Sequence, residues 1–282
     1  MKKIRPIKKV LRSITTSDGA GVRLRRVFSN NETELTDPFL LLDFFGSDNP
    51  NDYIAGFPWH PHRGIETITY MLQGQVKHED SIGNSGIIES GDCQWMTAGS
   101  GIIHQEMPGR VDGAMMGFQL WANLPSSHKM MHPRYRDIKE SDIPKVETDE
   151  GCVIRIIAGE FQSASGPVKE IVTDPEYFDI FVPANTEFRH VTKKEHNVLA
   201  YVFEGEGTFS NDKTIQTDRL VIFDSGDEIV ITTKEYPVRF LLISGKPIGE
   251  PIAWYGPIVM NTREELEVAF REFQEGTFIK HK

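Results

Sequence analysis

The segment "YMLQGQVKHED" (Tyr70–Asp80) decides the predicted fold, because the chain repeats its pattern as "YVFEGEGTFSND" (Tyr201–Asp212). Further along, "SGDCQWMTAG" from Ser90 is matched by "SGDEIVITT" from Ser225. In each copy an apolar strand runs into a glycine and a hairpin, and a Ser-Gly-Asp turn then opens another strand. Two matched segments in the same order predict a duplicated β-barrel.

Short β-type runs fill most of the chain, separated by Gly, Asn, Asp and Pro. They are rich in Val, Ile, Thr, Phe and Tyr, which predicts an all-β sandwich or barrel. In the hairpin "KHEDS", His78 and Glu79 are expected to be exposed near the tip. The runs that define the predicted strands are "ETITYML", "CVIRIIA", "YFDIFV", "VLAYVFEG", "RLVIFD", "EIVITT" and "VRFLLI".

A helix is predicted near the end of the chain, in "NTREELEVAFREFQEG" (Asn261–Gly276). Thr262 and Glu265 have the spacing of a capping box, and an apolar stripe follows before the glycine. The charged, proline-bearing segment "MHPRYRDIKESDIPKVE" lies between the two copies. It places a domain boundary near residue 140, so we expect domains at 1–140 and 141–282, the second including the helix.

The composition limits the classes of function. A net charge of −10 argues against a general nucleic-acid binder, which would carry a basic face. Cys93 and Cys152 are far apart and form no CxxC motif, which excludes a cysteine-based zinc site and indicates a reducing compartment. The N-terminus shows no apolar signal segment, and "FLLLDFF" is too short to cross a bilayer. We therefore expect a cytoplasmic protein that binds neither membrane nor nucleic acid directly.

Four side chains of the first copy form a candidate metal site. His60 and His62, in "FPWHPHRGIETITYMLQG", are two residues apart, so on a strand they share a face, about 6.6 Å apart along the backbone. His104 and Glu106, in "GSGIIHQEMP", have the same spacing. The hairpin and turn between the two pairs can bring their strands side by side. Glu66 has the parity of the first pair and is a further candidate for that face.

Imidazoles and a carboxylate without a thiolate suit divalent iron, nickel, copper, zinc and manganese. Four protein ligands leave two positions of an octahedral ion open for a substrate oxygen and for O2 or water. Glu106 could accept the substrate proton as the general base. Phe57, Trp59 and Met96 either line a flat apolar pocket beside the metal or pack in the core, and the sequence leaves both interpretations open.

These motifs resemble those of pirin, a family of bicupin iron proteins. The resemblance implies two consecutive cupin barrels with a short C-terminal helix. It also implies one iron ion in the first barrel, held by His60, His62, His104 and Glu106, with Glu66 beside the site and not a ligand. The segments that carry it are "HPHRGIETITYMLQGQVKHEDSIGNSG", "GDCQWMTAGSGIIHQEMP", "GFQLWANLP" and "GEPIAWYGPIVMNTREELEVAFREFQEGTF".

The second copy lacks both histidine-bearing motifs. His190 and His196 are six residues apart, Glu195 precedes the latter, and no His-x-Glu follows the "SGDEIVITT" turn. We therefore expect the second barrel to bind no metal.

The resemblance implies two kinds of function, which remain alternatives at this point. The first is quercetin 2,3-dioxygenase activity, the O2-dependent opening of a flavonol ring with loss of carbon monoxide, in which Glu106 would double as base. The second is a non-enzymatic role, either as an iron-dependent redox sensor and transcriptional co-regulator or as a modulator of a partner protein. The expected ligands are accordingly a small phenolic substrate and O2, or a protein.

Overall fold

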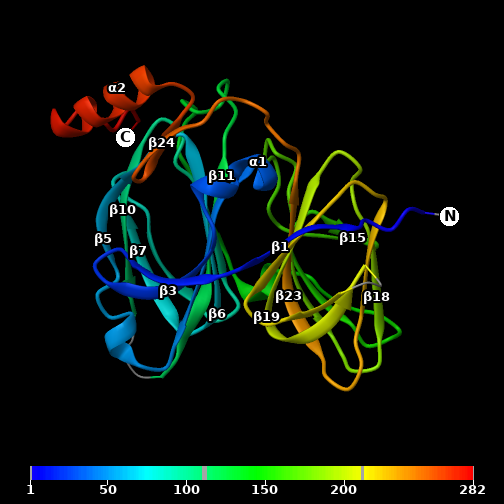
Figure 1. The fold of residues 1–282 in the computed structure, drawn as a ribbon. Coiled ribbons are helices and arrows are strands. Elements are labelled where there is room, and N and C mark those ends of the chain that lie inside the picture. The colour runs from blue at the N-terminus through cyan, green and yellow to red at the C-terminus, as the bar shows by residue number, and fades with distance from the viewer. Residues whose placement is uncertain (1, 110–112, 211–212, 282) are drawn as a thin grey trace. The chain divides into compact units, whose positions relative to one another are not determined.

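The computed structural model describes residues 2–109, 113–210 and 213–281 and divides into two compact units (Figure 1). The first unit, here barrel A, contains Ile14–Asn31, Phe39–Glu140 and the chain from Ile248 onward. The second, barrel B, contains the chain up to Ser13, Glu32–Pro38 and Ser141–Pro247.

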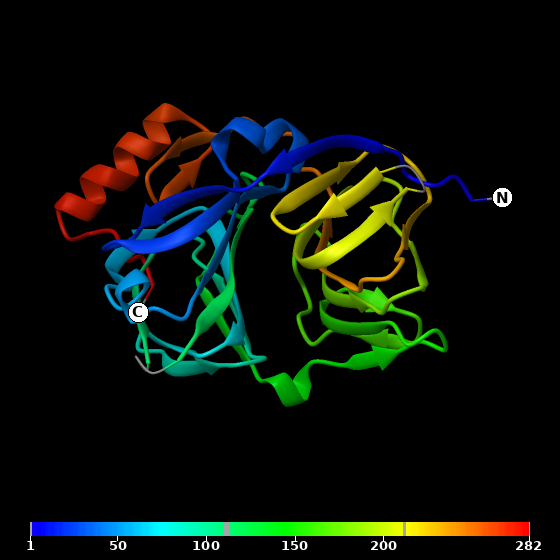
Figure 2. The same ribbon diagram turned by 60° about the horizontal axis from the view of Figure 1, so that its bottom comes forward.

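Barrel A is built from two antiparallel sheets that form the two layers around its interior (Figures 1 and 2). One sheet has the order β12-β9-β6-β11-β4-β3-β2, and the other has the order β5-β10-β7-β8. The strands of the first sheet are β2 (Ile14–Asp18), β3 (Val22–Phe28), β4 (Phe39–Ser47), β6 (Ile65–Gln73), β9 (Cys93–Thr97), β11 (Met115–Asn123) and β12 (Arg134–Ile138). Those of the second are β5 (Phe57–His62), β7 (Gln75–Asp80), β8 (Ser85–Glu89) and β10 (Ile102–Pro108).

The C-terminal part of the chain completes barrel A. A hairpin of β24 (Ala253–Tyr255) and β25 (Ile258–Met260) leads into helix α2 (Arg263–Gln274), the red helix of Figure 1. The predicted capping box of Thr262 and Glu265 is confirmed. Ala269 of the helix is fully buried against Ile258 and Met260. Because its apolar side packs on β25, the helix belongs with barrel A and not with the predicted domain 141–282.

Barrel B is organised around a sheet with the order β1-β21-β19-β23-β17-β14-β13, onto which β18, β20 and β22 are joined. Its first strand comes from the N-terminus, because β1 pairs with β21 along its length. The elements are β1 (Ile7–Arg12), α1 (Thr33–Thr36), β13 (Lys145–Glu147), β14 (Val153–Ala158), β15 (Glu160–Phe161), β16 (Ala164–Ser165), β17 (Glu176–Val182), β18 (Glu187–Val191), β19 (Asn197–Phe209), β20 (Lys213–Gln216), β21 (Arg219–Phe223), β22 (Glu228–Thr232) and β23 (Val238–Gly245). Short 3-10 turns lie at Asn30–Glu32, Pro50–Asp52 and Glu140–Asp142.

The two copies detected in the sequence have the same local structure, built around a glycine. At Gly74 (φ +87°) the chain leaves β6 in one sheet and enters β7 in the other. At Gly205 (φ +72°) β19 passes from pairing with β21 and β23 to pairing with β20 and β22. A Cβ at Gly205 would lie 2.0 Å from the carbonyl oxygen of Pro237, so both the backbone angle and the close approach require glycine there.

Apolar side chains of the strands pack into a core in each barrel, as the strand patterns predict. The predicted strands "ETITYML", "CVIRIIA", "YFDIFV", "VLAYVFEG", "RLVIFD", "EIVITT" and "VRFLLI" are all present, as β6, β14, β17, β19, β21, β22 and β23. Cys93 and Cys152 are buried free thiols. Among the described residues, no helix is long and apolar enough to cross a membrane.

Candidate metal centre

Three histidines meet in the interior of barrel A, at the junction of β5 and β10. The two strands pair antiparallel, with His104 directly opposite His60. The ring centroids of His60 and His104 are 4.4 Å apart, and those of His62 and His104 are 5.0 Å apart. The expectation that the hairpin and turn bring these strands together is confirmed.

Hydrogen bonds to backbone carbonyls set which nitrogen of each β5 histidine is free. Nδ1 of His60 lies 2.8 Å from the Pro58 oxygen, and Nδ1 of His62 lies 2.9 Å from the Pro257 oxygen. A carbonyl only accepts, so each Nδ1 carries the proton and each Nε2 presents a lone pair. The two Nε2 atoms face each other at 3.1 Å. Two facing lone pairs need a proton or a cation between them.

The third histidine adds a further unsatisfied nitrogen. Nε2 of His104 is buried and has no hydrogen-bond partner among the described residues. A buried ring nitrogen without a partner is costly unless something else occupies its lone pair. In the part of the chain that the structure describes, the donor atoms of His60, His62 and His104 lie within 4.8 Å of one another. The arrangement of the donors therefore fits a metal ion.

Burial favours the neutral form of His62 and His104, which is the form that binds a metal. Desolvation, with a contribution from nearby His60, lowers the pKa of His62 to about 3. Desolvation and the neighbouring histidines hold the pKa of His104 well below its ordinary value. At neutral pH, protons therefore do not compete for either ring.

Glu106 lies beside this group but outside it. A register irregularity in β10 separates it from His104, and its carboxylate is not within the 4.8 Å group of donor atoms found among the described residues. Instead Oε1 of Glu106 accepts a hydrogen bond of 2.8 Å from the hydroxyl of Thr69 on β6. The same hydroxyl lies 2.7 Å from Oε1 of Gln119 on β11. Thr69 therefore fixes the direction of the Glu106 carboxylate.

His78 is buried, and the expectation that it is exposed near a hairpin tip is wrong. Its side chain is 1 % exposed, because the alternation of β7 turns it toward the interior of barrel A. Its Nδ1 lies 3.4 Å from Nδ1 of His104, and its Nε2 lies 3.4 Å from Oδ2 of Asp80. The imidazole of His78 therefore lies next to Nδ1 of His104, away from its unpartnered Nε2, and the carboxylate of Asp80 lies beyond His78.

A pocket of about 710 Å³ opens beside the histidines. His60, His62 and Glu106 line it together with Phe57, which also packs against the core of barrel A. Trp121 also lines it, with its ring edge-to-face to His62 at 5.0 Å. The C-terminal hairpin supplies part of the wall, from Trp254 to Pro257.

The other two predicted pocket residues lie elsewhere. Trp59 is 51 % exposed and does not line the pocket. Met96 is fully buried and packs with Leu40, Ile65 and Ile102 in the core of barrel A. Of the two interpretations that the sequence left open, core packing holds for Met96.

Glu66 is buried on β6, in a different sheet from His60 and His62. The turn at Gly64 (φ +78°) separates the two strands, so the shared parity of the sequence does not carry across it. Oε1 of Glu66 accepts a 2.5 Å hydrogen bond from Thr97 on β9. Desolvation raises the pKa of its carboxyl, although hydrogen bonds oppose this effect.

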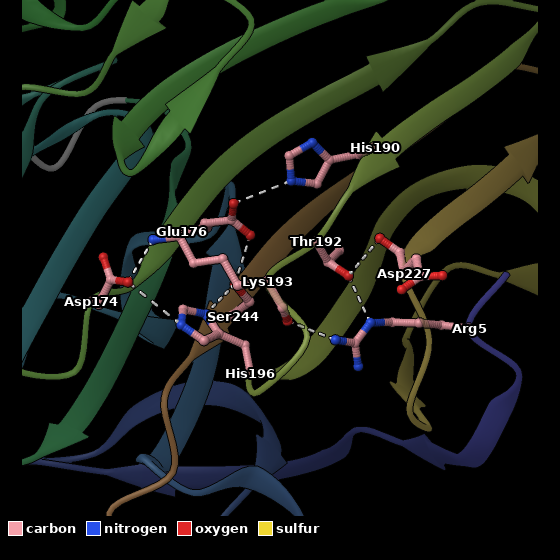
Figure 3. A network of polar contacts seen from close by, with 9 residues as sticks. All are labelled: Arg5, Asp174, Glu176, His190, Thr192, Lys193, His196, Asp227 and Ser244. Atoms are coloured by element: carbon pink, nitrogen blue, oxygen red, sulfur yellow. Dashed lines mark hydrogen bonds and ion pairs between the residues drawn. The ribbon is translucent and has the colours of Figure 1, made fainter. Parts of the chain in front are cut away.

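In barrel B the corresponding strands present different residues. His190 on β18 lies opposite Ile229 of β22, where barrel A has His60 opposite His104. Figure 3 shows that His190, His196 and Ser244 instead form a polar network with Glu176. The absence of a metal from barrel B stays a prediction.

Several groups that surround the histidines carry little or no signal in the sequence. Thr69 and Gln119 lie on strands whose apolar pattern gave no reason to select a single hydroxyl or amide. Pro257 acts through its backbone carbonyl, and it is 195 residues from His62. The "KHED" motif does indicate that His78 lies with Asp80, because side chains two residues apart on a strand share one face.

Known proteins are similar to this chain along most of its length. The family described as Pirin matches residues 21–122, and the Pirin C-terminal cupin domain matches residues 177–279. A Pseudomonas aeruginosa protein named "Putative quercetin 2,3-dioxygenase PA3240" is 47 % identical over 92 % of this chain and 93 % of its own. A pirin-like protein of Caulobacter vibrioides is 43 % identical, over 98 % of this chain and 99 % of its own.

The fold is shared with a solved structure as well. The crystal structure of quercetin 2,3-dioxygenase from Acinetobacter baumannii superimposes with a TM-score of 0.91 and 32 % identity, covering 98 % of each chain. Both sheets of barrel A and the sheet of barrel B are thus those of a bicupin. The chain belongs to the pirin family.

Proposed function

We propose that barrel A holds one iron ion through His60, His62, His104 and Glu106 and that the protein is a dioxygenase of quercetin-type flavonols. The reaction would consume O2, open the central ring and release carbon monoxide. The observation that carries the proposal is the convergence of the ring nitrogens of His60, His62 and His104 within 4.8 Å of one another, beside a pocket that His60 and His62 line. The donors also suit nickel, copper, manganese or zinc.

Different residues would bind the metal, accept the proton and hold the substrate. The three histidines and Glu106 would hold the ion, and an iron ion there supplies the one-electron chemistry through which O2 reacts with an electron-rich phenol. Glu106, which lines the pocket, would accept the proton of the substrate hydroxyl. Trp121 and Phe57 would hold the flat ring system and exclude water from it.

The experiment is a quercetin-decay assay on iron-loaded protein, under air and under argon. We expect decay that requires O2, that is lost in His60→Ala, and that is strongly reduced in Glu106→Gln, which keeps the shape of the side chain but removes its basic oxygen. His132→Ala, which changes an exposed histidine of barrel A, is the matched control and should retain activity.

Two results would contradict the proposal in different ways. Decay that persists under argon or in His60→Ala would show that the site does not carry the reaction. Full metal occupancy in His104→Ala would instead show that the ligand set is wrong. An iron-loaded protein that binds quercetin but does not consume it would favour the non-enzymatic, regulatory alternative.

A further inference from the structure

A charged group lies in the same pocket, on the sheet that faces the histidines. Asp18, Arg26 and Asp43 come from β2, β3 and β4, and all three line the pocket. Arg26 donates from Nε to Oδ1 of Asp43 at 2.9 Å and from one terminal nitrogen to Oδ2 of Asp43 at 2.7 Å. The same terminal nitrogen lies 2.6 Å from Oδ2 of Asp18.

This group has more hydrogen-bonding capacity than the ion pairs use. An arginine has five N–H donors, and the second terminal nitrogen of Arg26 has no partner among the described residues. Asp43 is only 4 % exposed, whereas the Asp18 side chain is 51 % exposed. A carboxylate accepts about four hydrogen bonds, so Asp18 retains accepting capacity beyond Arg26 and the Gly19 amide. An unused N–H donor of Arg26 and unused acceptor positions of Asp18 therefore lie next to each other.

The position of the group is fixed by the strand register. Arg26 lies opposite Asp43, Asp43 opposite Gln119, and Gln119 opposite Thr69. These residues form a polar row across four neighbouring strands that ends at Thr69, the residue bonded to Glu106. Three interstrand spacings place Arg26 roughly 14 Å from Thr69 at the level of the backbone. This span suits a flat molecule of three fused or linked rings, and Leu24, Leu41 and Phe45 line the pocket beside it.

The charges of Asp18, Arg26 and Asp43 indicate which chemical groups a ligand can place there. The guanidinium of Arg26 is already paired with two aspartates, so a carboxylate on the ligand would meet repulsion from them. A plain aromatic ring would leave the spare polar groups without partners, which costs free energy. A phenolic hydroxyl is neutral and both donates and accepts, so it satisfies Asp18 and Arg26 together.

We propose that Asp18, Arg26 and Asp43 form the subsite that recognises hydroxyl groups on the substrate ring remote from the metal. The inference rests on the proposed function, because it concerns which flavonols that site takes. The subsite would make the protein prefer flavonols whose pendant ring carries hydroxyls over those whose pendant ring is bare.

The test is equilibrium binding under argon to iron-loaded protein, followed by steady-state kinetics in air. The probes are galangin, kaempferol and quercetin, which share the hydroxychromone system and carry an increasing number of hydroxyls on the pendant ring. We expect wild-type affinity to rise along this series. In Asp18→Asn the affinity for quercetin should fall about three- to tenfold, because an amide oxygen accepts a phenolic hydrogen bond more weakly than a carboxylate does, with galangin unchanged.

The matched control is Asp48→Asn, which makes the same charge change on an exposed side chain of barrel A outside the pocket and should alter none of these values. The double variant Arg26→Met, Asp43→Asn removes the ion pair without leaving a buried charge alone. If it melts as the wild type does, it should bind all three flavonols with similar affinity. Loss of fold in the double variant would leave the Asp18→Asn comparison to decide.

Three outcomes would overturn the inference. Equal affinity of the wild type for the three flavonols would do so while leaving the proposed function intact. So would tighter binding of a flavonol that carries a carboxylate on the pendant ring, since that would make Arg26 an anion site. Failure of the iron-loaded wild type to bind any flavonol would remove the proposed function and this inference with it.

Discussion

The hydroxyl oxygen of Thr69 lies 2.8 Å from Oε1 of Glu106, joining β6 of one sheet of barrel A to β10 of the other. Both side chains are buried, at 3 % and 7 % exposed. A hydroxyl has one proton, and a carboxylate is a stronger acceptor than the amide oxygen of Gln119 that also faces it. Thr69 is therefore a positioning residue for Glu106.

On the proposed ligand set, we expect Thr69→Val, which keeps the shape and removes the proton donor, to weaken metal binding by about 10- to 100-fold, as loss of a ligand's hydrogen-bond partner typically does. Thr69→Ser keeps the hydroxyl and should remain within a few-fold of the wild type. The measurement is metal affinity by competition with a chelator, together with the spectrum of the cobalt-substituted protein. Equal affinity and spectra in the Val and Ser variants would show that this hydrogen bond does not position Glu106.

His78 should support His104 in a similar way. Its Nδ1 faces Nδ1 of His104 at 3.4 Å, and Asp80 stands on its other side. His78→Phe fills the same space without a nitrogen, so we expect about a tenfold loss of metal affinity with little change in melting temperature. His132→Phe serves as the control on an exposed histidine. Unchanged metal affinity in His78→Phe would assign His78 to packing alone.

The buried carboxylate of Glu176 should make the free energy of unfolding depend on pH. Burial opposes its charge, but hydrogen bonds from His190 and Ser244 outweigh burial and hold the pKa of Glu176 below its ordinary value of 4.5 (Figure 3). As the pH falls below about 4.5, the unfolded chain binds this proton before the folded one does, so the stabilising contribution is lost.

The measurement is the free energy of unfolding of the wild type and of Glu176→Gln between pH 7 and pH 3. The advantage of the wild type should be full at neutral pH and shrink as the pH falls below about 4.5. Glu195→Gln changes an exposed carboxylate of barrel B and should show no such trend. A wild-type advantage that grows on acidification would reverse the assigned direction of the pKa shift.

Gly205 should tolerate no side chain. Its φ of +72° costs a residue with a Cβ about 1–2 kcal/mol, and the Cβ would lie 2.0 Å from the Pro237 oxygen. We expect Gly205→Ala to lower the free energy of unfolding by roughly 2–5 kcal/mol. Gly249→Ala has a similar φ of +68° with no atom within 4 Å of the added Cβ, so it isolates the backbone cost. Denaturant unfolding that gives equal losses for both would show that the close approach is relieved at little cost.

The sequence by itself determined the architecture and the three histidines. The duplicated strand-glycine-strand pattern required two similar barrels, since it recurs in the same order around Gly74 and Gly205. The two-residue spacing of His60 and His62 fixed their common face, because strand side chains alternate regardless of what surrounds them. The capping box of α2 was equally local, and it is present as predicted.

Only the tertiary structure decided which groups serve these histidines. The Pro257 carbonyl reaches His62 across 195 residues, and Arg26 meets the row of Gln119 and Thr69 only through the register of four strands. Alternation predicts that a residue faces inward, but it does not say which strands become neighbours or which polar atoms then come within hydrogen-bonding distance. The packing of the two sheets of barrel A determines these contacts, and it places Thr69 against Glu106. The pairing of β7 with β10 places His78 against His104.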